Sequence, residues 1–258
     1  MRIVVKIGTS TLAHKTGRLN IRLVEEIVKI LSDIKNAGNE VILVSSGAIG
    51  MGAGKLLLKS RPEDVAGKQA AAAVGQCELM YTYDKLFDEY RHTVGQVLIT
   101  SDDIENETKR ENFRNTIFKL LDYNVIPVIN ENDTVSTVEI NSIGDNDTLA
   151  AYVAKTSEAD LLILLSDIDG LYTEDPRVNP KAGMIANVYE ITPEIEELAG
   201  GAGTAFGTGG MCTKVSAAKL VMEAGIDMII MNGERPRLIY EAVAGNSVGT
   251  RFHAKKEK

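Results

Sequence analysis

The chain has 258 residues, of which 44% are hydrophobic and 25% are charged, and its formal net charge is −8 at pH 7. This is the composition of a globular protein with enough apolar residues for one large core or two modest lobes. The acidic excess argues against a general nucleic-acid or anionic-membrane binder, because such surfaces need excess Lys and Arg to neutralise phosphates. No apolar run approaches the roughly 20 residues of a membrane span, and no signal peptide precedes the first strand-like run, so we expect a cytoplasmic protein.

Short apolar runs, which predict buried strands, alternate with longer amphipathic segments, which predict helices. In chain order we expect a strand at 3–7, a helix at 23–34, a strand at 41–44, a helix at 66–89, a strand at 94–99, a helix at 109–122, a strand at 125–129, a helix at 147–155, a strand at 161–165, a helix at 216–224 and a strand at 228–231. Such alternation predicts an α/β fold with a mostly parallel sheet between helical layers. No linker separates independent domains, and we expect one domain of two lobes that meet near residues 155–160.

The polar motifs follow predicted strands or precede predicted helices, which is where open α/β sheets collect ligands. Lys6 lies within the first strand and is followed by Gly8, Thr9 and Ser10. A lysine in an apolar strand is costly unless it is paired or solvated, so a phosphate or carboxylate site is indicated. An edge-strand lysine that reaches out to water is the structural alternative.

The most informative motif is GTGGMCTK at residues 207–214, a glycine-rich turn that runs into an apolar, helix-like segment. Its backbone N–H groups, the start of a helix and Lys214 together predict a phosphate cradle. The spacing is not that of a Walker A loop, and a surface loop before a helix remains the alternative. Cys212 lies in this turn, where its thiol pKa could be lowered, but we interpret it as a bystander.

Three further motifs suit an amino-acid ligand. Residues 45–48 (SSGA) offer hydroxyl and amide donors to a carboxylate, whereas residues 130–133 (NEND) and 144–147 (GDND) offer acids and amides that could grip an ammonium group. Each could instead be a helix cap or turn, and both Asp145 and Asp147 suit a cap. The spacing of these acids does not match an EF-hand calcium loop.

Another motif, Ser166-Asp167, follows the strand at 161–165. Its Asp167 could orient basic groups or bind a metal-associated water. The proline-containing loop at 173–177 could enclose a nucleotide base or ribose, with an ordinary polar turn as the alternative. Cys77 and Cys212 match no disulfide or metal-ligand spacing, and the three isolated histidines match neither a zinc site nor a histidine-based triad.

The ordered set of these motifs resembles the amino acid kinase family over essentially the whole chain. Within that family it is most similar to the members that use ATP to phosphorylate the side-chain carboxylate of L-glutamate, giving L-glutamyl 5-phosphate on the way to proline. The resemblance implies a three-layer αβα sandwich, with an amino-acid-binding lobe at residues 1–155 and an ATP-binding lobe at residues 156–258. Mg²⁺ would arrive with ATP, bound mainly through its phosphates, and we assign no protein metal ligand.

The resemblance also implies site residues. Lys6 and Lys214 would contact the transferring phosphoryl group, and Asp167 would organise these two lysines. Glutamate would be held by Ser46, Asp133 and Asn146. The ATP site would be lined by Lys6, Ser166, Asp167, Thr208, Gly209, Gly210, Met211, Cys212, Thr213 and Lys214.

Implied partners are proline as feedback inhibitor, a glutamyl phosphate reductase and further copies of the chain in a homo-oligomer. Many members carry an additional C-terminal PUA-like domain, whereas this chain ends at Lys258. Aspartate, acetylglutamate, carbamate and uridylate kinases are alternatives within the fold, and a catalytically silent amino-acid or nucleotide sensor is an alternative of another class. Retention of Lys6, Asp167 and Lys214 together argues against the sensor.

Overall fold

The structure, a computed structural model, describes residues 1–14, 16, 18–136, 146–200 and 210–255. Its centre is an eight-stranded sheet with the order β3-β4-β2-β1-β5-β7-β8-β6. The strands are β1 (Arg2–Ile7), β2 (Glu40–Ser45), β3 (Val94–Ile99), β4 (Ile126–Glu131), β5 (Leu161–Ser166), β6 (Asn187–Val188), β7 (Asp227–Asn232) and β8 (Thr250–Phe252). All pairings are parallel except that between β7 and β8, so the predicted mostly parallel sheet is confirmed.

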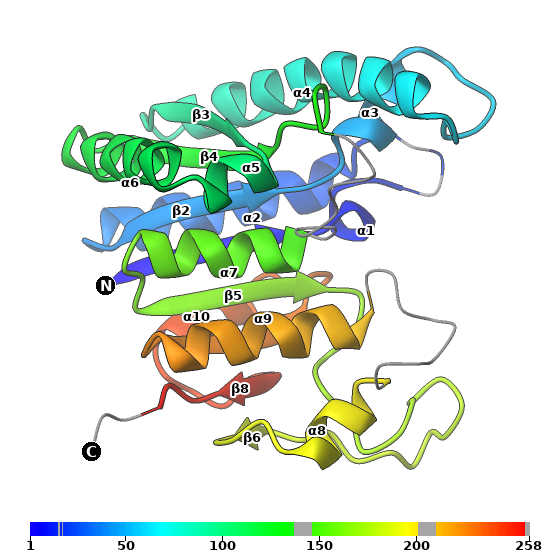
Figure 1. Cartoon of the computed structure of the whole chain (residues 1–258), viewed down its shortest axis with the longest axis vertical. Coiled ribbons are helices and arrows are strands. Elements are labelled where there is room, and N and C mark those ends of the chain that lie inside the picture. Colours follow the sequence, from blue (N-terminus) through cyan, green and yellow to red (C-terminus); the bar gives the residue numbers. More distant parts are fainter. Residues whose placement is uncertain (15, 17, 137–145, 201–209, 256–258) are drawn as a thin grey trace.

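Helices cover both faces of this sheet, as Figure 1 shows. The helices are α1 (Thr9–Leu12), α2 (Ile21–Asn36), α3 (Ala48–Lys55), α4 (Val65–Asp88), α5 (Ser101–Glu105), α6 (Glu107–Asp122), α7 (Asn146–Thr156), α8 (Pro193–Leu198), α9 (Met211–Glu223) and α10 (Leu238–Val243). One apolar core lies between the sheet and α5, α6, α7 and α9, and the other lies between the sheet and α1, α2, α3, α4 and α10. This is the expected αβα sandwich.

The strand β1 occupies the middle of the sheet and pairs with β2 on one side and β5 on the other. The β1–β5 pairing runs from Ile3 opposite Leu161 to Ile7 opposite Leu165, so one sheet continues across residues 155–160. The chain therefore builds outward in opposite directions from β1. Beyond the β1–β5 pair the sheet continues with β2 on one side and with β7 on the other. Open α/β sheets bind ligands at such a switch in strand order, beyond the carboxyl ends of the strands.

Most predicted elements match observed ones within a few residues, and the strand at 94–99 coincides with β3. The start of α9 differs from the prediction, because the helix begins at Met211 rather than Ser216. Lys214 therefore lies in the first turn of a helix. Short elements without a clear period, such as α5, α10 and β8, were not predicted.

Candidate active site

Three buried charged side chains lie together at the carboxyl end of β1. The Nζ atom of Lys6 is 2.5 Å from Oδ1 of Asp147, and the Nζ atom of Lys214 is 3.0 Å from Oδ2 of the same carboxylate. The side chain of Asp147 is 1% exposed, and those of the two lysines are 8% and 9% exposed. We refer to Lys6, Asp147 and Lys214 as the charged triad.

The sheet and two helices build this triad from distant parts of the chain. Residues on β1 point alternately to opposite faces, so Lys6 shares the face of Val4, which packs in the core beneath α7 and α9. Asp147 lies in the first turn of α7, and Lys214 in the first turn of α9. The hydroxyl of Thr213 also donates to Oδ2 of Asp147 over 3.2 Å.

The carboxylate that contacts both lysines in this structure is Asp147 and not Asp167, so the organising role expected for Asp167 stays a prediction. Asp167 instead accepts a hydrogen bond from the Ser166 hydroxyl over 3.2 Å and borders a neighbouring cavity. The physical reason is position. Asp167 follows the carboxyl end of β5, whereas Asp147 lies in the first turn of α7, which packs against β1 on the face that carries Lys6.

Electrostatics keep Asp147 ionised. Burial alone raises the pKa of its carboxyl group, but the neighbouring Lys6 and Lys214 ammonium groups outweigh burial and lower the pKa to about 2. At neutral pH the triad with both ammonium groups charged carries one net positive charge. A buried site of this charge suits an anionic group that arrives between the lysines.

A cavity of about 450 Å³ borders the triad on the β5 side. Its lining residues are Ser166, Asp167, Ile168, Asp169, Tyr172, Pro176, Arg177, Gly210, Met211, Lys214 and Asn232. Five residues expected at the ATP site (Ser166, Asp167, Gly210, Met211 and Lys214) thus line one cavity. Pro176 and Arg177 from the loop at 173–177 also border it.

Among the described residues expected at the ATP site, Lys6, Cys212 and Thr213 do not line this cavity. Thr208 and Gly209, like Gly144 and Asp145 of the acidic motif, fall outside the described residues. Thr213 turns its hydroxyl toward Asp147, and Lys6 reaches the same carboxylate. Cys212 lines a different cavity on the outer side of α9.

A smaller cavity of about 220 Å³ lies on the β2 side, beyond the ends of β1, β2 and β4. Its lining residues are Thr9, Ser46, Gly47, Ala48, Ile49, Gly50, Arg61, Asn130, Glu131, Asp133 and Asn146. It contains Ser46, Asp133 and Asn146, the three residues expected to hold the amino acid. Gly47, with a φ of 94°, makes the left-handed turn that starts α3 at this cavity.

A hydrogen-bond network holds the polar wall of this second cavity. The side-chain amide of Asn146 donates to the Ser46 hydroxyl over 2.6 Å, to the backbone carbonyl of Ser45 over 2.8 Å and to Oδ1 of Asn130 over 3.1 Å. Asn130 in turn donates to Gln76 on α4 over 2.9 Å. The end of β2, the residue that follows it and the end of β4 are therefore tied to the start of α7, next to Asp147.

The carboxyl group of Asp133 differs electrostatically from that of Asp147. Burial and the nearby Glu131 carboxylate raise its pKa to about 6, although Arg61 acts in the opposite direction. Such a group is destabilised as an anion until a cation arrives beside it. An ammonium ligand would supply that cation.

Sequence reasoning missed two residues of this region, Asp147 as the partner of the lysines and Arg61 in the second cavity. Asp147 was visible only as a helix-cap candidate, because its two partners are 141 and 67 residues away. Arg61 lies in a loop between α3 and α4 that carries no recognisable motif.

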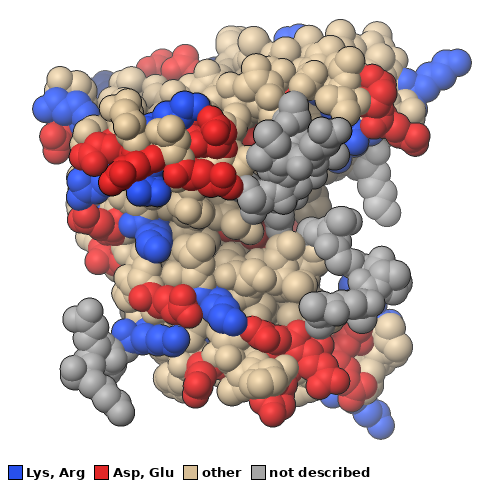
Figure 2. Space-filling model, viewed as in Figure 1, with Lys and Arg blue, Asp and Glu red and all other residues tan. Residues whose placement is uncertain are grey.

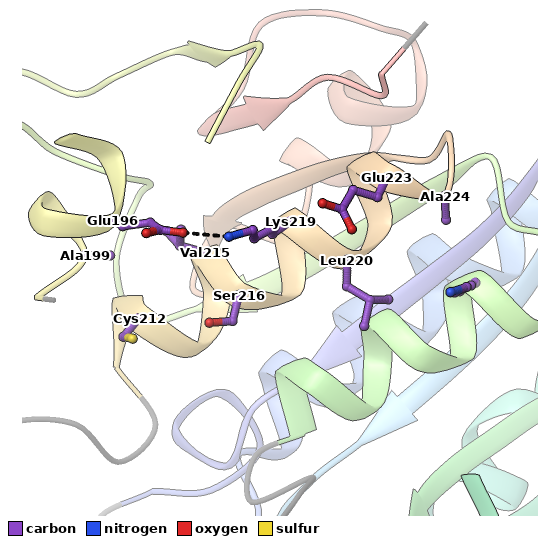
Figure 3. A pocket seen from close by; sticks show the side chains of 10 residues that line it. Glu196, Ala199, Cys212, Val215, Ser216, Lys219, Leu220, Glu223 and Ala224 are labelled. Carbon is purple, nitrogen blue, oxygen red and sulfur yellow. Dashed lines mark hydrogen bonds and ion pairs between the residues drawn. The ribbon is translucent and has the colours of Figure 1, made fainter. Parts of the chain in front are cut away.

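A further cavity, of about 610 Å³, lies apart from the triad, on the outer side of α9 against α7 and α8 (Figure 3). Val215, Leu220 and Ala199 give it an apolar floor, and at its rim Lys219 pairs with Glu196 over 2.9 Å. We assign no chemistry to it, because this charged pair at its rim is mutually satisfied.

The face of the molecule in Figure 2 carries blue and red side chains interspersed, with acidic residues gathered around α8. Within the described ranges, no cluster of three or more His, Cys, Asp or Glu side chains is arranged to hold a metal ion. No helix among the same residues is long and apolar enough to cross a bilayer.

The fold, the buried lysine pair and the two cavities at the carboxyl ends of the strands define a class of protein. The amino acid kinase family matches residues 1–232, and the chain belongs to that family. Among curated relatives, a glutamate 5-kinase of Clostridium perfringens is 55% identical, covering 99% of this chain and 96% of the relative. A glutamate 5-kinase of Listeria innocua is 52% identical, covering 100% of this chain and 94% of the relative.

Solved structures agree on the fold. Carbamate kinase from Giardia lamblia bound to AMP-PNP superimposes with a TM-score of 0.69 at 18% identity, covering 98% of each chain. An isopentenyl phosphate kinase substrate complex has a TM-score of 0.66 at 18% identity, covering 97% of this chain and 99% of the other.

Proposed function

We propose that this protein is an ATP-dependent kinase that phosphorylates the side-chain carboxylate of L-glutamate to L-glutamyl 5-phosphate. The single observation that carries the proposal is the buried charged triad, of which Lys214 lines the larger cavity, while Asn146, the neighbour of Asp147 in the chain, lines the smaller one. The names of relatives at 51–55% identity over nearly the whole chain support glutamate as the acceptor.

The cavity of about 450 Å³ on the β5 side, the larger of the two next to this region, would hold ATP, and the cavity of about 220 Å³ on the β2 side would hold glutamate. The γ-phosphate and the acceptor carboxylate would then meet at Lys6 and Lys214. A glutamate side chain has an intrinsic pKa of about 4.3 and is already ionised at neutral pH, so the reaction needs no general base. The carboxylate oxygen attacks the γ-phosphorus, the bond from that phosphorus to the β–γ bridging oxygen breaks, and ADP leaves with the bonding electrons.

The barrier is then mainly the approach of two anions, and catalysis rests on position and charge. Lys6 and Lys214 would neutralise the transferring group, while Asp147 fixes both ammonium groups over distances of 2.5 and 3.0 Å. Mg²⁺ bound to the ATP phosphates would supply further charge neutralisation. Of the two acids that line the larger cavity, Asp167 is better suited to a water on that ion, because it accepts a hydrogen bond from the Ser166 hydroxyl, whereas Asp169 is engaged by Asn232 and by an ion pair with Arg235.

The proposal extends to the biological setting that the family resemblance implies. In that setting the reaction would be the first step of proline biosynthesis, and it would take place in the cytoplasm. Proline would act as feedback inhibitor of a homo-oligomer, and a glutamyl phosphate reductase would consume the acyl phosphate.

The test is to incubate the purified protein with Mg-ATP and hydroxylamine and to measure both ADP and acyl hydroxamate. L-Glutamate, L-aspartate, N-acetylglutamate and no acceptor are offered in parallel. We expect glutamate-dependent formation of both products. Turnover only with another acceptor would overturn the substrate, and ATP binding without turnover would favour a sensor.

A further inference from the structure

The smaller cavity carries an unusual balance of charge. Its lining includes two acids, Glu131 and Asp133, and one cation, Arg61. Glu131 is held in place, because the Ser136 hydroxyl donates to its Oε1 over 2.7 Å. The amides and hydroxyls of Asn130, Asn146 and Ser46 complete a wall without further charge.

This inference rests on the proposed function, because it concerns which protein groups bind the three charged groups of L-glutamate. The side-chain carboxylate must approach Lys6 to meet the phosphoryl group. The α-ammonium can supply the positive charge that would stabilise the ionised form of Asp133, the carboxyl group whose pKa is raised. The α-carboxylate remains, and it would face two acids unless a positive group neutralises it.

Arg61 is the one cationic side chain among the described residues that line this cavity. It extends from the connection between α3 and α4, and it makes no hydrogen bond or ion pair with another described side chain. Its positive charge acts to lower the pKa of the Asp133 carboxyl group, so the guanidinium lies within electrostatic range of that acid. Its guanidinium is therefore available to an incoming anion.

We propose that Arg61 is a specificity-determining residue that binds the α-carboxylate of the acceptor amino acid. A guanidinium can hold a carboxylate through two parallel N–H···O bonds, which fixes its orientation as well as its charge. Together with Asp133, Arg61 recognises the zwitterionic head of a free α-amino acid. The cavity then selects for acceptors that carry both an α-ammonium and an α-carboxylate.

The experiment compares L-glutamate with 4-aminobutyrate, which keeps the ammonium and the reacting carboxylate but lacks the α-carboxylate. Hydroxamate formation gives kcat/KM for each acceptor in the wild type, in Arg61→Met and in Arg61→Lys. Lys59→Met is the matched control, because Lys59 is an exposed cation of the same loop that does not line the cavity. Circular dichroism and the KM for ATP monitor folding and the other cavity.

We expect Arg61→Met to raise the KM for glutamate on the order of 10- to 100-fold with little change in kcat, as for loss of a charged hydrogen-bonded pair. The ratio of kcat/KM for glutamate to that for 4-aminobutyrate should fall by the same factor. Arg61→Lys should recover part of the loss, and Lys59→Met should match the wild type.

An unchanged glutamate KM in Arg61→Met would overturn the inference, as would an equal loss for both acceptors, which would mean that Arg61 acts only through the acids. Failure of the proposed function looks different, because the wild type itself would then form no glutamyl hydroxamate.

Discussion

Lys6 and Lys214 share one carboxylate, so each lysine has its position set by the same neighbour. Replacement of either lysine by Ala removes one preorganised positive group from the place where phosphoryl charge develops. We expect kcat to fall on the order of 10²- to 10³-fold for Lys6→Ala and for Lys214→Ala. Steady-state ADP release measures this, and a loss below tenfold in either variant would contradict the role of that lysine.

Lys219→Ala is a suitable control for these variants. Lys219 lies on the same helix as Lys214, but its side chain is half exposed and pairs with Glu196 at the outer cavity. Its replacement should leave kcat within about twofold, since exposed ion pairs contribute little.

Asp133 makes the binding of glutamate depend on pH. With a raised pKa of about 6 in the free protein, its carboxyl group is largely protonated below that pH and cannot attract an ammonium group. A bound ammonium favours the ionised form, so glutamate affinity should rise with pH through about 6 and level off above it. The profile of kcat/KM for glutamate reports the free enzyme and should show this acidic limb.

Asp133→Asn tests the assignment, because an amide does not titrate in this range. The variant should bind glutamate more weakly at pH 8 and should lose the limb near pH 6. A limb that persists unchanged in Asp133→Asn would assign the titration to another group.

Helices α3 and α4 cross at two glycines, and this contact supports the smaller cavity. A Cβ atom on Gly75 would overlap the carbonyl oxygen of Ala48, the first residue of α3, and one on Gly52 would overlap that of Ala71. Gly75→Ala must therefore push α3 away from α4, a form of overpacking that typically costs about 1–3 kcal/mol.

Since Ser46 and Gly47 directly precede α3, we expect Gly75→Ala to raise the KM for glutamate more than that for ATP and to lower the melting temperature. Ala70→Ser, at an exposed position of α4, is the control. Equal effects on both substrates would indicate that the shift is not confined to the α3 side.

At the scale of the whole molecule, a buried cluster lies at the end of the sheet opposite to the triad. Lys35 and His92 are each 8% exposed, and Nε2 of His92 and Oγ of Ser32 have no partner among the described atoms. Burial lowers the pKa of His92, with the Lys35 ammonium acting in the same direction and a hydrogen bond to the Ser32 backbone opposing them.

A histidine with a lowered pKa binds fewer protons in the folded state than in the unfolded state. Its contribution to stability is therefore complete above the unfolded value of about 6.5 and declines as the pH falls below it. Asp133, whose pKa is raised to about 6, acts in the opposite direction over this range, so the test compares the two proteins: from pH 7 to pH 5 the melting temperature of His92→Gln should fall less, or rise more, than that of the wild type. A slope that is unchanged in His92→Gln would assign it to other groups.

The carboxylate of Asp147 contributes over a different range. Its pKa is lowered to about 2, so its stabilising ion pairs persist above the unfolded value near 3.8 and are lost as the pH falls toward 2. The two effects therefore separate on the pH axis.

Much of the fold and part of the site followed from sequence alone. The alternation of apolar runs and amphipathic segments predicted the long strands and helices, because period 2 and period 3.6 are local properties of the chain. Polar motifs after strands also predicted where Lys6, Ser46 and Asp133 gather, since the carboxyl ends of parallel strands share one edge.

Only the tertiary structure decided which charges meet. Local pattern tells which face a residue occupies, but the partner on that face depends on packing between segments far apart in the chain. This is why Asp147 rather than Asp167 lies between the two lysines, and why Cys212 faces the outer cavity although its neighbour Met211 lines the inner one. Arg61 likewise joins the acids of the smaller cavity only because the contact between α3 and α4 brings their connecting loop over it.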